Sequence, residues 1–386
     1  MRPASILAGL FLVAITLRPQ IVGIGPLLPA MQESLHTTHA VAGLLGTIPV
    51  LCMGLFAPPA AYLGARIGTR AAIALSVLLI GAFGVARAVA PSAAFVVLLT
   101  WPIGVGMGLA GALVPVAVKE SFPLRPAGPT GVYTTGVQVG SALSAAIAVP
   151  IALWYGGWRA SLVAFSLVTI GMAGVWLLVT SATPAQERAK ARPPRLPWHS
   201  HIAWLLVALF SLMAFTYYGI NAWLPDSYVE RGWGETAAGS LLALLNLVAI
   251  PVALVVPWLS DRVGTRRRWL IAMAAIFLVG MSGIVLAPEA AYAWAVALGL
   301  ANGAMFALVL TLPLDLEDEP TLVGALIGMM LGVGYTIGAV SPFVLGAIRD
   351  ATGSFATSLW IITAFSGLLV AAAAALPKAH EVPASI

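Results

Sequence analysis

The chain has 386 residues, of which 60% are hydrophobic and 9% are charged, and its formal net charge is +5. Soluble domains carry about 25% charged residues, so this composition excludes a soluble globule as well as secreted, nucleic-acid-binding and disordered proteins. A bilayer span needs about 20 mostly apolar residues, and the mean hydropathy of +0.99 indicates an integral membrane protein. Cys52 is the single cysteine, which excludes an intrachain disulfide and a cysteine-based metal site.

Apolar runs separated by charged clusters predict twelve transmembrane helices. The first run continues past Arg18 to about Met31 without a small-residue cleavage site, so we interpret it as an uncleaved helix and not as a signal peptide. The predicted spans are 5–32, 39–63, 70–90, 94–118, 130–154, 159–180, 201–225, 236–259, 269–288, 291–314, 322–346 and 356–376.

The polar, proline-rich and basic stretch at 182–200 predicts a linker between two groups of six helices. We therefore expect an N-terminal six-helix bundle at 1–181, a cytoplasmic linker at 182–200 and a C-terminal six-helix bundle at 201–386. With a cytoplasmic N-terminus, fourteen Lys and Arg residues fall on the cytoplasmic side, four on the outer side and Arg18 within the membrane. The positive-inside rule thus predicts a multi-pass protein of the inner or plasma membrane with both termini in the cytoplasm.

The two halves of the chain are copies of one another. A shift of 196 residues without gaps aligns Leu28-Pro29 with Leu224-Pro225, and RIGTR at Arg66–Arg70 with RVGTR at Arg262–Arg266. Four identities in five positions of a charged loop, in constant register with the other matches, are specific. Two parallel repeats of six helices are one of the known transporter plans, with the substrate site between the halves near the midplane of the bilayer.

Several of these strings resemble a known family. DRVGTRR, from Asp261 to Arg267, resembles the Asp-Arg-x-Gly-x-Arg core of the major facilitator signature, although Ala65 stands in place of the Asp in the N-terminal copy. LRPQIVGIGPLLPAM at 17–31, AGLLGTIPVLCMGLFAP at 42–58 and GVYTTGVQVGSAL at 131–143 resemble the branch of cyanate permeases and 2-nitroimidazole transporters.

The resemblance implies an all-α integral membrane protein with the major facilitator fold, twelve transmembrane helices in two pseudo-symmetric six-helix bundles. It also implies that the loops 64–70 and 260–268 are gating loops, whose contacts between the halves stabilise the outward-open state. The residues that carry this expectation are Arg66, Gly68, Arg70, Asp261, Arg262, Gly264 and Arg266.

Arg18 is the strongest single signal for a site. It lies about thirteen residues into the first span, roughly 19 Å along a helix, and so is too deep to reach water easily. A mid-membrane arginine costs on the order of 2.5–3.5 kcal/mol and is expected to face a polar cavity or a partner. Its planar fork of donors suits a carboxylate-like or other small oxyanion. Pro19 follows directly and disfavours regular helix at Arg18. Two roles stay open, substrate contact and permanent pairing with helix carbonyls.

Other polar and aromatic side chains lie mid-span on helices that we expect to line the cavity. Each serves equally well as a ligand contact or as a hydrogen bond between helices. The candidate substrate-binding residues, with Arg18, are Gln20, Tyr133, Gln138, Tyr217, Tyr218, Asn221, Asn246, Asn302 and Tyr335. The pairs His36/His39 and His199/His201 fall in predicted loops without nearby cysteines or acidic clusters, so we expect neither a metal site nor a cofactor.

Together these features predict a secondary active transporter that works by rocker-switch alternating access. With no predicted acid at the depth of Arg18, the expected substrate is a small anionic or electron-rich polar solute, a cyanate-like anion or a nitro-heterocycle. No clustered nucleophiles, metal ligands or paired acids are predicted at membrane depth, so we do not expect an enzyme. The expected partners are this solute and the lipid bilayer, without nucleic acid, and the expected state is a monomer. Facilitated diffusion, proton-coupled uptake and efflux stay open, and the alternative function is an efflux pump for neutral or aromatic drug-like compounds.

Overall fold

The computed structural model describes residues 3–122, 127–180, 196–262, 266–317 and 320–377, and the elements in these ranges are helices. The N-terminal half contains α1 (Pro3–Thr16), the 3-10 helix η1 (Val22–Leu27), α2 (Leu28–Leu35), α3 (His39–Leu55), α4 (Ala57–Ile67), α5 (Thr69–Ala88), α6 (Ala93–Ser121), α7 (Ala127–Tyr155) and α8 (Trp158–Val179). The C-terminal half contains α9 (His201–Val229), α10 (Glu235–Arg262), α11 (Arg266–Leu286), the 3-10 helix η2 (Pro288–Ala290), α12 (Ala291–Leu316), α13 (Pro320–Gly338), α14 (Ser341–Thr352) and α15 (Phe355–Ala375).

The predicted spans correspond to these helices, singly or in consecutive groups. Ten stretches of the described chain are long and apolar enough to cross a membrane, and α3 with α4, which meet at an angle of 56°, form an eleventh. The remaining predicted span, the first, contains an apolar helix at Ala4–Thr16 that is too short to cross alone. The chain is therefore an all-helical, multi-pass membrane protein.

The prediction of one continuous helix over 5–32 is wrong, because this segment is interrupted at residues 17–21. Pro19 has no backbone N–H, and its ring disfavours helical backbone at the preceding Arg18. The Arg18 carbonyl accepts hydrogen bonds from the backbone N–H groups of Ile21 and Val22, at 3.0 and 2.9 Å, and these bonds turn the chain into η1. The interruption thus falls at the residue that the sequence singles out.

Prolines interrupt two further segments. The predicted span 39–63 bends at Phe56, two residues before the Pro58-Pro59 pair, and the span 322–346 is interrupted at residues 339–340, before Pro342. In both cases the prolines occupy the first turn of the following helix, where a missing N–H costs no hydrogen bond. Transmembrane helices tolerate such breaks where neighbouring helices or a cavity satisfy the freed backbone groups.

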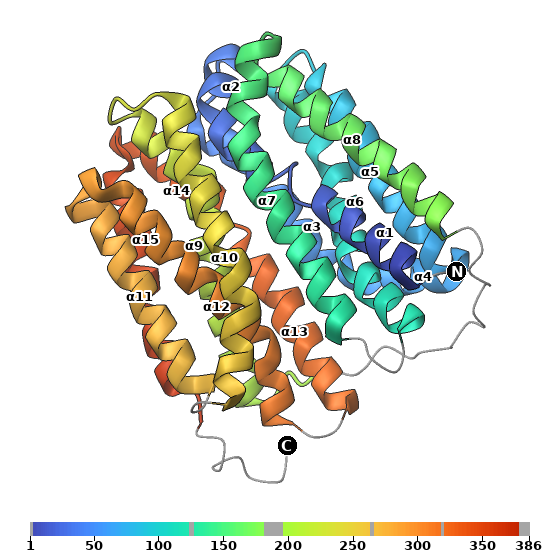
Figure 1. Ribbon diagram of the computed structural model, residues 1–386. Coiled ribbons are helices and arrows are strands. Elements are labelled where there is room, and N and C mark those ends of the chain that lie inside the picture. The colour runs from blue at the N-terminus through green and yellow to red at the C-terminus, as the bar shows by residue number, and fades with distance from the viewer. Residues whose placement is uncertain (1–2, 123–126, 181–195, 263–265, 318–319, 378–386) are drawn as a thin grey trace.

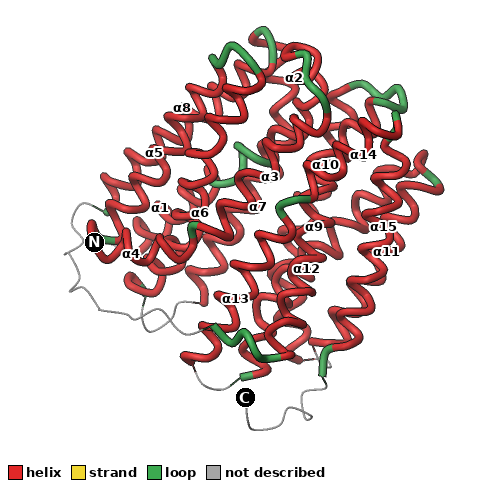
Figure 2. Tube along the Cα trace, turned by 180° about the vertical axis from the view of Figure 1, so that it is seen from behind, coloured by secondary structure: helices red, strands yellow, loops and turns green. Residues whose placement is uncertain are grey.

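The two halves lie side by side, with α1–α8 in one group and α9–α15 in the other (Figure 1), and the view from behind shows the same division (Figure 2). Across the boundary α3 packs on α13 and α14, α7 packs on α10, and η1 packs on α9. Under the 196-residue shift α3 corresponds to the first part of α10, and α7 corresponds to α13 with α14. The packing of α3 on α13 and α14 is therefore the symmetry equivalent of the packing of α7 on α10. Of the predicted linker, residues 182–195 lie outside the described residues.

Gly25 and Asn221 are equivalent positions in this repeat, and they touch. A side chain at Gly25 would collide with the backbone carbonyl oxygen of Asn221, so only glycine lets η1 approach α9 this closely. Contact between equivalent residues places the pseudo-two-fold axis between them. Arg18 corresponds to Ala214 in the other half, so the cationic side chain has no counterpart across this axis.

Candidate functional site

A cavity of about 170 Å³ lies between the two halves next to Arg18. A smaller cavity of about 30 Å³ adjoins it and shares Arg18, Gln138, Phe306 and Tyr335 with it. Apolar side chains make up much of the larger wall, and they come from both halves. These apolar residues are Leu17, Met53, Met107, Val114, Val137, Ile250, Ala253, Phe306, Ala307 and Leu310.

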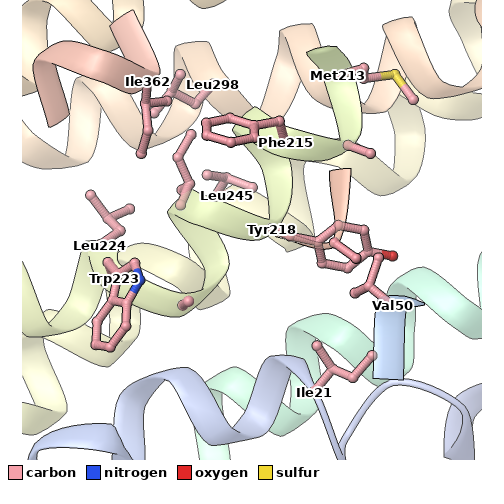
Figure 3. Packing of buried hydrophobic residues seen from close by; sticks show 14 of the residues in the cluster. Ile21, Val50, Met213, Phe215, Tyr218, Trp223, Leu224, Leu245, Leu298 and Ile362 are labelled. Carbon is pink, nitrogen blue, oxygen red and sulfur yellow. The ribbon is translucent and has the colours of Figure 1, made fainter. Parts of the chain in front are cut away.

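Arg18 reaches both cavities from the interruption between α1 and η1. Its side chain is buried, with 8% of the residue exposed, and its Nη1 donates a hydrogen bond of 2.9 Å to the hydroxyl oxygen of Tyr218 on α9. In Figure 3 the ring of Tyr218 projects from its helix toward the N-terminal half, from which Val50 and Ile21 come. The Arg18–Tyr218 hydrogen bond therefore joins the two halves beside the cavities.

Aromatic rings gather around this cation. The Tyr218 ring lies 5.2 Å from that of Tyr217 and 6.4 Å from that of Tyr335, measured between centroids. Tyr335 in turn meets Phe210 edge to face at 4.8 Å. Tyrosines offer an apolar ring face together with a hydroxyl that donates or accepts, so this wall suits a flat solute with polar substituents.

The structure brings seven of the ten sequence-predicted residues to these two cavities. Besides Arg18, the larger cavity is lined by Tyr133, Gln138 and Tyr335, and the smaller one adds Tyr217, Tyr218 and Asn302. These residues come from the interruption before η1 and from α7, α9, α12 and α13. Side chains that are far apart in the sequence therefore converge on one place.

The three other predicted residues lie elsewhere. Asn246 is buried and joins α10 to α9, since its Nδ2 donates to the Asn221 Oδ1 at 3.4 Å and its Oδ1 accepts from the Tyr217 hydroxyl at 3.1 Å. Asn221 lines a separate cavity of about 10 Å³ beside Gly25. Gln20 is directed into the N-terminal half and lines neither cavity beside Arg18. The side-chain amides of Asn221 and Asn246 thus form hydrogen bonds between helices.

Among the described residues that line the two cavities beside Arg18 there is no Asp or Glu. Three acids on helices that line these cavities lie near the ends of those helices: Asp315 of α12 pairs with Arg266, Glu120 of α6 accepts a hydrogen bond of 2.8 Å from Thr69, and Asp226 lies at the far end of α9. A cation in a mostly apolar cavity without a neighbouring acid raises the local potential and attracts anions.

One end of the boundary between the halves is closed by polar contacts. Asp350, at the end of α14, accepts hydrogen bonds from the backbone N–H groups of His39 and Ala40 at 3.1 and 2.8 Å, and contacts the His39 ring at 2.7 Å. The carboxylate therefore caps the N-terminus of α3 from the other half, where the helix dipole favours negative charge. His39 Nε2 also lies 3.6 Å from Asp226, which accepts a hydrogen bond of 3.2 Å from Gln32.

These contacts correct the interpretation of His39 as a loop residue without acidic neighbours. His39 is the first residue of α3, and Asp226 of α9 and Asp350 of α14, which contact it, lie more than 180 residues further along the chain. Within the described part of the chain, no group of three His, Cys, Asp or Glu side chains is placed to hold a metal ion.

The larger cavity lies toward the opposite end of the helices. Val114 lies near the end of α6 and Tyr133 near the start of α7, while Ala253 and Leu310 lie in the later parts of α10 and α12. The ends of α6 and α10 lead to basic stretches, with Lys119 and Arg125 in one and Arg266 to Arg268 in the other, whereas α12 leads to the acidic stretch 315–319. The cavity is thus separated from the His39–Asp350 end and extends toward the end that carries the predicted gating loops 64–70 and 260–268.

The described residues of the predicted gating loops contact their own half. Arg66 stacks on the Tyr62 ring at 4.7 Å, and Arg70 donates to the Thr180 hydroxyl at 2.8 Å. Gly68 ends α4 with a φ of 85°, a conformation that favours glycine. Arg266 pairs with Asp315 of α12. Asp261 and Arg262 are the last residues of α10, and the structure describes their backbone but not their side chains. Gly264 lies outside the described residues.

Sequence reasoning missed one buried cation. The count of basic residues puts Arg87 at the outer side, and it does lie in the last turn of α5, but its side chain is completely buried inside the N-terminal half. The available signal was its place inside the predicted span 70–90 and not in a loop. Tyr218, whose hydroxyl pairs with Arg18, is one of the predicted candidates, but the sequence does not predict that it is the partner of Arg18.

Comparison with known proteins agrees with this arrangement. Residues 6–339 match the family described as the Major Facilitator Superfamily. The chain belongs to this superfamily. It is therefore a secondary transporter and not an enzyme, and it has the major facilitator fold that the sequence predicts.

Two relatives from Escherichia coli (strain K12) match over most of their length. The 2-nitroimidazole transporter is 31% identical, with 94% of this chain and 93% of the relative covered. The cyanate transport protein CynX is 30% identical, with 90% of each covered. Among solved structures, a bacterial homologue of the human lysosomal transporter Spinster, inward-facing and unoccupied, superposes with a TM-score of 0.79 at 18% identity, covering 96% of this chain and 95% of that one. This likeness concerns the fold.

Proposed function

We propose that this superfamily member transports a small anionic or electron-rich polar solute, a cyanate-like anion or a nitro-heterocycle, and that Arg18 binds it at the centre of the protein. The observation that carries the proposal is a buried arginine in the lining of a central cavity that has no Asp or Glu among its described lining residues. A carrier of cations would need a carboxylate there. The two bacterial relatives that transport cyanate and 2-nitroimidazole support the same substrate class.

The transport cycle we propose is rocker-switch alternating access between the bundles 1–181 and 201–386, joined by the linker 182–200. With both termini in the cytoplasm of the cell, the closed His39–Asp350 end is the outer end and the larger cavity opens inward. The loops that carry Arg66, Arg70 and Arg266 would then meet across the boundary in the outward-open state. We propose that the protein acts as a monomer in the inner or plasma membrane, since one chain contributes both walls of the cavity.

Coupling to protons requires a titrating group that reaches the pathway. Of the three acids named above, Asp226 is the one that lies at the boundary between the halves, where Gln32 and His39 contact it. Uptake that follows an imposed pH gradient across a vesicle membrane would indicate proton-coupled transport, and uptake that ignores the gradient would indicate facilitated diffusion.

The test is a binding panel on the purified protein in detergent. Cyanate, nitrate and 2-nitroimidazole are expected to raise the melting temperature in a concentration-dependent way, because a ligand that binds the folded state stabilises it by RT ln(1 + [L]/Kd). Organic cations of similar size are expected to leave the melting temperature unchanged. Stabilisation by the cations but not by the anions would contradict the proposal.

A second candidate function is efflux of neutral or aromatic drug-like compounds. The observation that favours it is the wall of Met53, Met107, Phe306 and Leu310, which would bury an aromatic ring without help from Arg18. Neutral aromatic compounds in the same panel distinguish the two functions: stabilisation that persists when Arg18 is replaced by methionine would support efflux.

A further inference from the structure

Arg87 is a completely buried cation, and its hydrogen-bond partners among the described residues are uncharged. Its Nη2 donates to the side-chain oxygen of Gln20, its Nη1 donates to the Thr100 hydroxyl at 3.3 Å, and its Nε has no hydrogen-bond partner. A buried guanidinium without an acid is costly, and such groups in membrane proteins are rare and commonly functional. The charge makes its hydrogen bond to Gln20 roughly twice as strong as one between neutral groups.

Gln20 is the residue through which Arg87 reaches the site. Its amide nitrogen donates to the Ser166 hydroxyl of α8 at 3.0 Å, so the side chain is held between α5 and α8. Gly84 of α5 leaves room for this contact, because a side chain there would collide with the Ser166 hydroxyl and crowd the Gln20 amide. The Gln20 side chain is thus fixed from three sides.

Gln20 lies two residues after Arg18 in the interruption between α1 and η1. This segment is outside regular helix, and its backbone is tied by the short turns that end at Leu17, Ile21 and Val22. Arg18 points to the central cavity, whereas Gln20 points into the N-terminal half. Where a segment has few backbone hydrogen bonds of its own, its side-chain contacts determine its position.

We propose that Arg87 is a positioning residue, which holds Gln20 and thereby fixes the Arg18 guanidinium in the lining of the central cavity. The inference rests on the proposed function, in which Arg18 binds the anion. It goes beyond that function because it assigns to substrate affinity a residue that lies outside the cavity. Small displacements of a binding group weaken its interactions steeply, by as much as about 100-fold for 1 Å in an active site.

The test compares the affinity for 2-nitroimidazole or cyanate, whichever stabilises the wild type, among variants of matched size. Arg87→Met and Gln20→Met are each expected to raise Kd by about tenfold, ~1.4 kcal/mol. The double variant is expected to lose less affinity than the two single losses added together, because both changes break the same hydrogen bond between Arg87 and Gln20. Arg159→Met is the control, because Arg159 is also an arginine of the N-terminal half, but it donates to the Ala88 and Ala90 carbonyls beside the same helix end and not to Gln20.

Ser166→Ala is a milder variant, to be used if the methionine variants do not fold. It removes one contact of Gln20 and is expected to raise Kd by about threefold, ~0.7 kcal/mol. Equal affinity in wild type, Arg87→Met and Ser166→Ala would overturn the inference even if their melting temperatures fall. Additive losses in the double variant would also overturn it, because Gln20 would then act without Arg87. If the wild type binds none of the probes, the proposed function fails. The positioning role of Arg87 is tested separately, because unchanged hydrogen exchange of residues 17–21 in Arg87→Met would overturn it.

Discussion

Arg18→Met is expected to weaken anion binding by about 100-fold, ~2.7 kcal/mol, because it removes the charged donor from the lining of the central cavity. The melting temperature of the unliganded variant is expected to stay unchanged or to rise, since a buried cation that lacks an acid costs desolvation energy that methionine does not. Thermal unfolding with and without the ligand gives both quantities. Loss of affinity together with retained stability separates substrate contact from a purely structural role.

Two variants complete this experiment. Arg18→Lys keeps the charge but loses the planar fork, so it is expected to bind a monatomic anion such as chloride better than it binds a planar anion. Tyr218→Phe removes the hydroxyl that accepts the Arg18 hydrogen bond and is expected to have a smaller effect than Arg18→Met. An Arg18→Met protein that binds the anions as tightly as wild type, or one that fails to fold while Arg18→Lys folds, would favour permanent structural pairing of Arg18.

Asp350→Asn is expected to shift the conformational equilibrium away from the closed His39 end by about tenfold, ~1.4 kcal/mol. The carboxylate caps the N-terminus of α3 from the other half and contacts the His39 ring, and a neutral amide weakens both interactions. The readout is the rate at which a thiol reagent modifies a cysteine introduced at Ala42, which is buried at this boundary, in a protein whose single native Cys52 is replaced by alanine.

Glu230→Gln provides the matched control for this prediction. It also removes one carboxylate charge at the same end, but the partner of Glu230 is Arg349, at 3.3 Å, and both residues belong to the C-terminal half. We expect its rate of modification to equal that of the wild-type background. Equal rates for Asp350→Asn and Glu230→Gln would show that the contact between the halves does not hold this end closed.

The sequence predicts the fold well because its main signal is local. About 20 consecutive apolar residues predict a span wherever they occur, and the register of 196 residues predicts the second half from the first. Arg18 is detected for the same reason, because a single charged residue inside an apolar run is visible from the local sequence without any information about its neighbours in space. The complete interruption at residues 17–21 follows from Pro19 but extends further than one missing hydrogen bond implies.

The sequence does not predict which residues pair with one another or in which direction a side chain of an interrupted segment points. Tyr218 lies 200 residues after Arg18, and Asp350 lies 311 after His39, so neither pairing leaves a trace in spacing or composition. Gln20 shows the same limit at short range. In a regular helix its direction relative to Arg18 would follow from the helical period, but across an interrupted segment that rule does not apply. The side chain consequently faces Arg87 and Ser166, and not the cavity.

The measurement that tests the central claim most directly is uptake of radiolabelled cyanate and 2-nitroimidazole into proteoliposomes that contain wild type, Arg18→Met or Arg159→Met. We expect saturable uptake of at least one of the two solutes by wild type and by Arg159→Met. Arg18→Met is expected to show uptake no faster than protein-free vesicles. Saturable uptake of that solute by Arg18→Met at the wild-type rate and half-saturation concentration would contradict a function centred on Arg18.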